Sequence, residues 1–242
     1  MKYFLIALQF LTILPVKIKA KIEDKDFGKS LLYFPAVGLI IGVILSITAF
    51  FFSRFAPFLS VAVILVVSVV LTGGIHLDGF ADTCDGFYAS HSKEQTLKIM
   101  RDSRIGVMGV IGIVCVFLLK FALLSSFSPA LLWRAVIIMA VFSRWALSFA
   151  CSLSKYARQK GKAEFFIKYA DKRAVLAGGI FTLATFLIFI GTKGVTVFIL
   201  SWIFVFLFVK YSEKKIGGIT GDILGAVNEI GEVSTLLFTA IL

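Results

Sequence analysis

"SVAVILVVSVVLTGGIHLDGFADTCDGF", residues 60 to 87, joins two segments of opposite character. The first part is apolar and belongs to a run over 55–75 that is long enough to cross a lipid bilayer. The second part places the carboxylates of Asp78, Asp82 and Asp85 within eight residues. Charge is costly to bury beside the hydrocarbon core, so charged residues there usually have a function. The junction therefore predicts a membrane span followed by a functional acidic box, the name used here for these three aspartates.

The whole chain has the composition of an integral membrane protein. It has 242 residues, 59% of them hydrophobic, and a mean hydropathy of +0.98, whereas soluble domains are roughly 45–50% apolar. Its apolar residues gather in runs near the roughly 20 residues that a spanning helix needs. These runs cover 31–53, 55–75, 105–127, 130–153, 174–192, 195–211 and 223–242. We expect an all-α fold, a polytopic membrane helix bundle with about seven transmembrane helices, in one domain over 1–242.

The loops predict an orientation in the membrane. Lys and Arg are concentrated before residue 31 and in the loops 76–104, 154–173 and 210–215, whereas the intervening loops have few or none. Positive charge marks cytoplasmic loops and attracts anionic lipid headgroups. We therefore expect a prokaryotic cell (inner) membrane, with the amino end inside and the carboxyl end outside. The same reasoning explains the net charge of +11 without a nucleic-acid partner.

The apolar segment before Pro15 is too short for an eighth span, so we expect it to be interfacial or re-entrant. Whether residues 1–16 cross the membrane stays open at this point.

The spacing of the acidic box suits a metal site. On a helix, the i, i+4, i+7 pattern places all three carboxylates on one face. Ligands that offer only oxygen suit Mg²⁺ or Mn²⁺. Gly79 and Gly86 each follow a carboxylate and leave room for a phosphate. The alternative is a solvated acidic turn, but the apolar Phe80 and Phe87 argue against it.

A second acidic cluster lies where the last span begins, in "GGITGDILGAVNEIGE", residues 217 to 232. Its polar side chains are those of Asp222, Asn228, Glu229 and Glu232. The Gly-rich loop before Asp222 has backbone N–H groups that can hold a phosphate at a helix start. The substrate-binding candidates in this loop are Gly218, Thr220 and Gly221, and Asn228 with its side-chain amide is a further candidate in the following span. Because the predicted topology puts both clusters at the cytoplasmic face, Asp222 can share a metal with the acidic box.

Further polar residues are candidates for binding an anionic substrate. "RDSRIGVMG", residues 101 to 109, supplies Arg101, Asp102, Ser103 and Arg104, and arginine suits bidentate phosphate contacts. Arg101 can equally be ordinary positive flanking of a span. Arg144 lies inside the run 130–153 and needs an acid or a diphosphate as partner. His76 is either structural or a ligand. We interpret the cations of 154–173, Arg158 among them, mainly as a topology signal that also attracts anionic substrate.

Three segments occur in order along the chain: "GGIHLDGFADTCDGF" (73–87), "KIMRDSRIGVMG" (98–109) and "GGITGDILGAVNE" (217–229). They resemble the signature blocks of the cobalamin synthase family, also called adenosylcobinamide-GDP ribazoletransferases. Two earlier segments, "LQFLTILPV" (8–16) and "YFPAVGLIIG" (33–42), are similar to the amino-terminal blocks of that family. The resemblance runs from residue 8 to about residue 232, which is nearly the whole chain.

The resemblance implies a membrane enzyme that completes the nucleotide loop of vitamin B12. Such enzymes join adenosylcobinamide-GDP to α-ribazole, or to its 5′-phosphate, giving adenosylcobalamin or its 5′-phosphate and releasing GMP, with Mg²⁺ required. In this chemistry we expect a metal on Asp78, Asp82, Asp85 and Asp222. The base that takes the hydroxyl proton would be Asp85 or Glu229, and Arg104 with Arg101 would contact the diphosphate. A homo-oligomer and association with enzymes of the same pathway stay open.

Two alternatives remain at this stage. CDP-alcohol lipid phosphotransferases have the motif D-x-x-D-G-x-x-A-R followed by G-x-x-x-D-x-x-x-D. Residues 82–86 match its opening, but position 90 is Ser where Arg is expected, and no second half follows. The other alternative is a cation transporter whose path is lined by the acids. It predicts acids at the middle of the bilayer, and broken or repeated helices.

Overall fold

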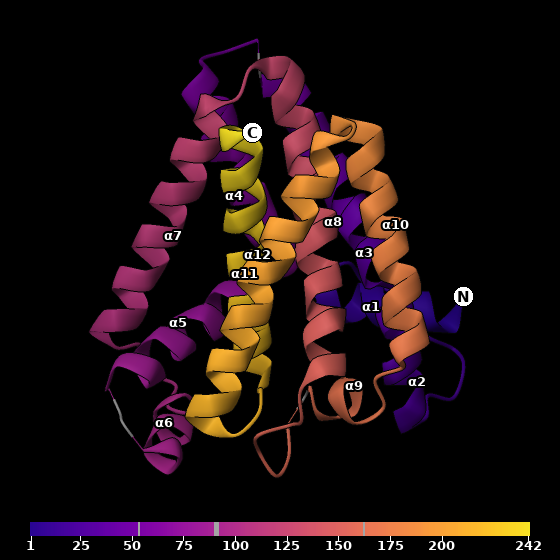
Figure 1. Cartoon of the computed structure of the whole chain (residues 1–242), viewed down its shortest axis with the longest axis vertical. Helices are drawn as coiled ribbons and strands as arrows, with labels where there is room; N and C mark the ends of the chain where they lie inside the picture. The colour runs from indigo at the N-terminus through magenta and orange to yellow at the C-terminus, as the bar shows by residue number, and fades with distance from the viewer. Residues whose placement is uncertain (53, 90–91, 162) are drawn as a thin grey trace.

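The computed structural model describes residues 1–52, 54–89, 92–161 and 163–242 as a bundle of helices (Figure 1). The helices are α1 (Lys2–Leu11), α2 (Asp24–Ser30), the 3₁₀ turn η1 (Leu31–Tyr33), α3 (Phe34–Phe52), α4 (Pro57–Thr72), α5 (Ile75–Ala89), α6 (Lys93–Ile99), α7 (Val107–Ser126), α8 (Pro129–Leu153), α9 (Glu164–Lys168), α10 (Lys172–Ile190), α11 (Lys193–Ile216) and α12 (Gly221–Ile241). The expected all-α membrane bundle is confirmed.

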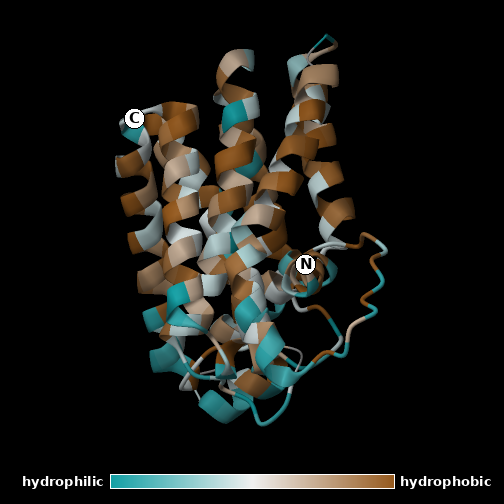
Figure 2. Cartoon of the chain, turned by 90° about the vertical axis from the view of Figure 1, so that its right-hand side faces the viewer, coloured by the Kyte–Doolittle hydropathy of each residue, from teal (hydrophilic) through white to brown (hydrophobic). Residues whose placement is uncertain are grey.

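Helices α8 and α12 form the centre of the bundle. The most apolar windows of α8 and α12 are 83% and 72% buried, whereas those of α7, α10 and α11 are only 22% to 28% buried. The outer helices nevertheless expose large apolar side chains, among them those of Leu118, Leu176 and Leu207, and the long helices in Figure 2 are mostly hydrophobic. Exposed apolar faces of this length suit contact with lipid.

Small residues allow α3 to pack closely along α8. A Cβ atom at Gly38 would lie 2.4 Å from the carbonyl oxygen of Ala140, and one at Gly42 would lie 2.7 Å from the Cα of Ile137. Any larger side chain at either position would collide with the α8 backbone. Small residues four apart are the usual means by which membrane helices approach one another. The pair therefore fixes α3 against the central helix.

The second predicted span differs from a simple crossing. Six helices in the described part of the chain are long and apolar enough to cross a membrane, and the bent pair α4–α5 makes seven if it counts as one span. The axes of α4 and α5 meet at 92°. Gly73 and Gly74 form the break with φ of 62° and 70°, a left-handed conformation that glycine adopts without steric cost. The acidic box therefore lies on a helix that turns away from the span before it.

The amino-terminal segment is a short helix. Helix α1 has ten residues, which corresponds to about 15 Å and is too short to cross the hydrocarbon core. Beyond its end, the N–H of Ile13 donates to the carbonyl of Leu71 at 2.9 Å. This contact holds the segment beside the break between α4 and α5, as an interfacial or re-entrant element would lie.

The loops rich in basic residues gather at one end of the bundle. Helices α2, α6 and α9 and the turn before α12 all lie at the lower end in Figure 1, and the carboxyl terminus lies toward the other end. Hydrophilic residues concentrate at the same lower end in Figure 2. The alternation of loops rich and poor in basic residues along the sequence therefore corresponds to two chemically different ends of the molecule.

Candidate functional site

The acidic box and the Gly-rich loop meet because α5 crosses α12 at two glycines. A Cβ at Gly79 would lie 2.8 Å from the Cα of Asp222, and one at Gly225 would lie 2.7 Å from the carbonyl oxygen of His76. The absence of both side chains lets the two backbones touch. We expected Gly79 to leave room for a phosphate, but the structure shows that it leaves room for α12. Gly86 is also a packing position, because a Cβ there would lie 2.5 Å from Met100.

A cavity of about 280 Å³ opens at this crossing, and we call it the acidic cavity. Asp78 and Asp222 line it from α5 and α12, and Tyr156 and Arg158 line it from the loop after α8. Asp82 lies nearby, since the charges of Asp222, Asp78 and Arg158 all act on its carboxyl group. Two segments about 140 residues apart in sequence thus form one charged site, as the sequence predicts for the acidic box and Asp222.

Asp222 is paired with a cation that we had interpreted as a topology signal. The Nη2 of Arg158 donates to Oδ2 of Asp222 at 2.6 Å and to the carbonyl of Met100 at 3.2 Å. Thr220 caps α12: its hydroxyl accepts from the N–H of Ile223 at 3.2 Å and donates to Asp222 at 3.3 Å. The start of α12 is therefore held by side chains on both sides of its first turn.

Asp85 has a different role in the structure from the one that its spacing predicts. Its two carboxylate oxygens accept the backbone N–H groups of Gly106 and Gly109, both at 2.7 Å. These donors belong to the start of α7, where an anion also interacts favourably with the helix dipole. Both oxygens are thus engaged in holding α7 against α5. Asp85 is thus a positioning residue in this structure, and its roles as metal ligand and base stay predictions.

The loop before α7 lies outside the cavity. Arg104 forms a two-pronged pair with Asp102, at 3.0 and 2.7 Å, and its side chain is 86% exposed. The hydrogen bonds from Arg104 hold the pKa of Asp102 well below its usual value. Ser103 and Arg101 are exposed as well, but the charge of Arg101 reaches Tyr156. Burial is the main reason why the pKa of Tyr156 is raised.

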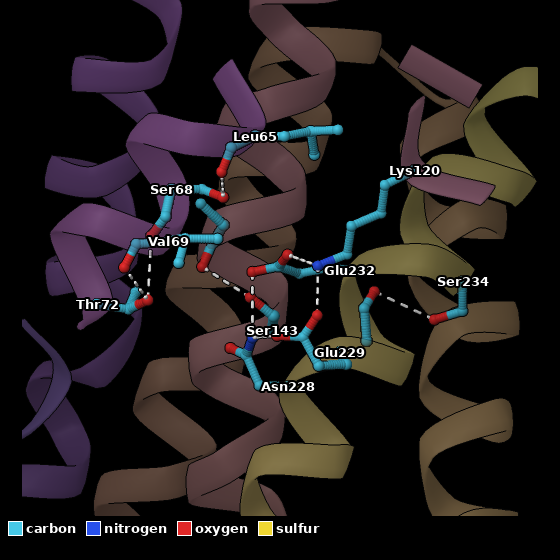
Figure 3. A network of polar contacts seen from close by, with 12 residues as sticks. Leu65, Ser68, Val69, Thr72, Lys120, Ser143, Asn228, Glu229, Glu232 and Ser234 are labelled. Carbon is cyan, nitrogen blue, oxygen red and sulfur yellow. Dashed lines mark hydrogen bonds and ion pairs between the residues drawn. The ribbon is translucent and has the colours of Figure 1, made fainter. Parts of the chain in front are cut away.

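A separate group of charges is buried in the middle of the bundle (Figure 3). Lys120 of α7 contacts Glu229 and Glu232 of α12, each at 2.5 Å, and Arg144 of α8 contacts Glu232 at 2.6 Å. The amide of Asn228 donates to both glutamates at 3.1 Å. We call Lys120, Arg144, Glu229 and Glu232 the buried network.

The buried network accounts for three of the predicted site residues. Arg144 is paired with Glu232, and Glu229 is paired with Lys120. Asn228 donates hydrogen bonds to both glutamates of the network. None of the three lines the acidic cavity. Lys120 holds the carboxylate of Glu229, and the role of Glu229 as the base stays a prediction. Substrate contacts of Arg144 and Asn228 remain predictions.

Of three other predicted residues, His76 and Gly221 line the acidic cavity, whereas Gly218 does not. His76 is buried and lines both the cavity and a small void beside the buried network. Gly221 lines the cavity and is exposed. Gly218 is buried, and a Cβ there would lie 2.4 Å from the carbonyl of Lys155, so the loop after α8 sets its position.

The two faces of α5 border different surroundings. Asp78 lies on the acidic cavity, whereas Phe80 and Cys84 line an apolar cavity of about 460 Å³ between α5, α7, α11 and α12. The helix is thus amphipathic, as the alternation of acids and apolar residues over 78–87 suggests.

The donors around the acidic cavity fit a hard divalent cation in their chemistry, although they do not form a closed coordination group in this structure. In the described part of the chain, no group of three or more His, Cys, Asp or Glu side chains is close enough to hold a metal ion. However, the nearby carboxylates of Asp78, Asp82 and Asp222 offer only oxygen, as Mg²⁺ prefers. Arg158 supplies one positive charge against these three negative charges, which leaves two in excess. The charge and chemistry of the cavity therefore suit a divalent ion.

Sequence reasoning missed the structural partners of both groups of acids. Lys120 lies within an apolar span, and that position alone is a signal of function or pairing. Tyr156 and Arg158 carried no comparable signal, because a basic loop beside a span is expected in any membrane protein. Only the contact of their loop with the start of α12 identifies them.

Comparisons with known proteins cover nearly the whole chain. A family model described as cobalamin-5-phosphate synthase matches residues 3–240. A protein of Clostridium acetobutylicum named adenosylcobinamide-GDP ribazoletransferase is 38% identical over 236 residues, which cover 96% of this chain and 93% of that protein.

Two further relatives have the same name. The one from Acetivibrio thermocellus is 38% identical and covers 98% of this chain and 96% of its own length. The one from Clostridium tetani is 36% identical, and the match covers 100% of this chain and 99% of that protein. No solved structure matches the chain.

Proposed function

Because this chain belongs to the cobalamin-5-phosphate synthase family, we propose that it is an adenosylcobinamide-GDP ribazoletransferase of cobalamin synthesis. The single observation that carries the proposal is the match along nearly the full length of chain and relatives alike. The acidic cavity supports it, since both glycine-rich acidic blocks of the family resemblance meet there. The expected resemblance to the cobalamin synthase family is thereby confirmed.

The reaction joins a nucleotide-activated corrinoid to α-ribazole or its 5′-phosphate. A ribose hydroxyl attacks the phosphorus that carries the cobinamide, a new P–O bond forms, and the bond to GMP breaks. The hydroxyl proton passes to a base, for which Asp85 and Glu229 are the predicted candidates, and GMP takes the electron pair of the broken bond. Such transfers depend mainly on positioning and on neutralising negative charge. The residues around the acidic cavity provide both a site and charged groups for this task.

Mg²⁺ is the cofactor that the donor set favours. When bound, it would neutralise charge on the diphosphate and on the departing GMP. Asp78, Asp82 and Asp222 would hold it, because Asp78 and Asp222 line the cavity, Asp82 lies nearby, and Arg158 alone does not balance their charges. Arg158 and Arg101 would add positive charge on the substrate side.

The location follows from charge. We place the protein in the cell (inner) membrane of a prokaryote with the acidic cavity on the cytoplasmic side. The support is that the loop after α8, which lines the cavity, lies at the end of the bundle where the basic loops gather (Figure 1). A cysteine-accessibility scan tests it: a thiol introduced at Lys160 should react only with reagents that cross the membrane, and one at Lys193 with impermeant reagents as well. The opposite pattern would contradict this orientation.

The decisive assay measures substrate use. Purified protein in detergent or liposomes is given adenosylcobinamide-GDP, α-ribazole and Mg²⁺, and the formation of adenosylcobalamin and GMP is followed by chromatography. Parallel reactions supply α-ribazole 5′-phosphate as acceptor, or a CDP-activated lipid with an alcohol. Turnover of the lipid and none of the corrinoid would overturn the proposal in favour of the lipid phosphotransferase.

One structural feature bears on the transporter alternative. The break between α4 and α5 is of the kind that this alternative predicts, and Glu229 and Glu232 are buried in the bundle. However, Lys120 and Arg144 neutralise both glutamates, so the buried network offers no open anionic path. Cation flux into liposomes in the absence of any nucleotide would nevertheless support transport, and we expect none above protein-free liposomes.

A further inference from the structure

The salt bridge between Arg158 and Asp222 lies at the cavity where the proposed function requires both a cation and a diphosphate to bind. The side chains of Arg158 and Asp222 are 11% and 20% exposed, and both line the acidic cavity. A pair so placed blocks two groups at once: the carboxylate is unavailable to a cation, and the guanidinium is unavailable to a phosphate.

The backbones of the two residues are held together independently of the salt bridge. Ala157 donates its N–H to the carbonyl of Ile219 at 2.9 Å, and the N–H of Ile219 donates to the carbonyl of Lys155 at 2.9 Å. These bonds tie the loop after α8 to the Gly-rich loop at residues just before Arg158 and Asp222 in each segment. The side chains of Arg158 and Asp222 can therefore exchange partners without any separation of the two loops.

Arg158 has hydrogen-bonding capacity that the salt bridge does not use. Its Nη2 donates both hydrogen bonds that Arg158 makes to the described residues, whereas its Nε is buried with no hydrogen-bond partner among them. A buried donor without a partner is costly. A phosphate can accept from two nitrogens of one guanidinium, which is the geometry for which arginine is suited.

We propose, on the basis of the proposed function, that Arg158 is a substrate-binding residue that exchanges partners. In the substrate-free protein its guanidinium neutralises Asp222. When a divalent cation takes the Asp222 carboxylate, the guanidinium is released and binds the diphosphate of the nucleotide substrate. The salt bridge thus keeps the cation and the nucleotide from binding well separately and makes each favour the binding of the other.

The charge balance supports this exchange. When fully ionised, Asp78, Asp82 and Asp222 carry three negative charges, and Arg158 with a divalent cation carries three positive charges. With the cation bound, the cluster including Arg158 is neutral. The cation then neutralises Asp222 in place of Arg158, so the salt bridge is no longer required. The incoming diphosphate then supplies the anion that the guanidinium requires.

The proposal predicts opposite effects on two ligands, which a purely structural salt bridge would not produce. In Arg158→Ala without nucleotide, Mn²⁺ should bind more tightly than in the wild type, on the order of fivefold to tenfold, because Asp222 no longer has a competing partner. GDP, used as a non-reacting diphosphate probe at saturating Mn²⁺, should bind more weakly, by about tenfold to a hundredfold. Electron paramagnetic resonance measures free Mn²⁺, and equilibrium dialysis measures GDP.

A reciprocal variant and a matched control sharpen the test. Asp222→Asn releases Arg158 from the other side, so GDP should bind more tightly than to the wild type when chelator removes all divalent ions. Lys160→Ala removes an exposed cation from the same loop and should change each affinity by less than about twofold. Arg158→Lys retains the charge and lacks the fork, so it should bind GDP with intermediate affinity.

Unchanged or weaker Mn²⁺ binding in Arg158→Ala would overturn the proposal, as would an equal loss of GDP binding in Lys160→Ala. If Arg158→Ala does not fold, the Asp222→Asn and Arg158→Lys results decide in the same way. The failure of the proposed function is seen separately, as a wild type that binds both ligands but never converts adenosylcobinamide-GDP.

Discussion

Helix α12 carries acidic side chains at two positions along its length, and the two groups are neutralised in different ways. Glu229 and Glu232 lie in the buried network, where Lys120 and Arg144 balance their two charges. Asp222 lies at the first turn, where it pairs with Arg158 and where the carboxylates of Asp78 and Asp82 lie nearby without a pairing guanidinium. A balanced buried group holds helices together, whereas an unbalanced group beside a cavity is prepared for a charged ligand. The sequence motif that contains both groups does not distinguish these roles.

The largest effect should come from unbalancing the buried network. Lys120→Met leaves one buried negative charge without a partner, which typically costs about 3–5 kcal/mol of stability. The double variant Lys120→Met/Glu229→Gln restores neutrality and should regain most of that loss. Unfolding by denaturant in detergent micelles measures both. Equal stability of the single and double variants would show that charge balance is not what this network provides.

The next effect concerns the acidic cavity. Asp82→Asn removes a carboxylate from the proposed metal-binding cluster and should lower turnover at saturating Mg²⁺ by about 10²–10³-fold, with little change in stability. Glu94→Gln, which alters an exposed acid on α6, is the matched control and should retain wild-type turnover. Wild-type turnover by a folded Asp82→Asn protein would refute the metal role of this residue.

Gly79→Ala should have a smaller effect, which lowers both the stability of the protein and metal binding at the acidic cavity. Gly79→Ala places a methyl group 2.8 Å from the Cα of Asp222, and overpacking of this kind costs about 1–3 kcal/mol. Because the methyl group pushes α12 away from α5, Mn²⁺ binding should weaken as well. Gly221→Ala is the control for stability, since its nearest contact would be an ordinary 3.7 Å. Undiminished stability in Gly79→Ala would mean that the crossing is looser than its geometry indicates.

The smallest effect should follow from changing the exposed arginine. Arg104→Ala should change turnover by less than about threefold, as is typical for an exposed ion pair. Since Arg104 lowers the pKa of Asp102, the pair forms above the ordinary aspartate pKa and is lost only as pH falls through the lowered value. The small effect should therefore be constant between about pH 6 and 8. A large rise in KM for adenosylcobinamide-GDP would instead favour the predicted diphosphate contact.

Much of the bundle could be predicted because spanning helices depend on local composition. The predicted run 130–153 corresponds to α8 at Pro129–Leu153, and 105–127 corresponds to α7 at Val107–Ser126. Length and apolarity suffice for such segments, since hydrocarbon leaves the backbone no alternative but to form internal hydrogen bonds. The run 55–75 was less predictable, because two glycines turn the chain by 92° and the following helix takes a new direction.

The candidate site was only half predictable, and Asp85 and Arg158 show why. Asp85 has the spacing of a metal ligand, but its oxygens accept backbone N–H groups from a helix that begins 22 residues later. Arg158 resembles any basic residue of a cytoplasmic loop, yet it pairs with Asp222, 64 residues further along the chain. Spacing predicts which residues can share a helix face. It does not predict which partners arrive from elsewhere in the chain.

By itself, the sequence determined the helical membrane architecture, the segregation of basic loops and the family, because these depend on composition and on contiguous motifs. The tertiary structure decided which acids are balanced and which are left in excess, because that balance depends on distances between segments far apart in the chain. The Coulomb energy of two charges falls with their separation and with the exposure of the site to water. Only the folded chain sets both quantities.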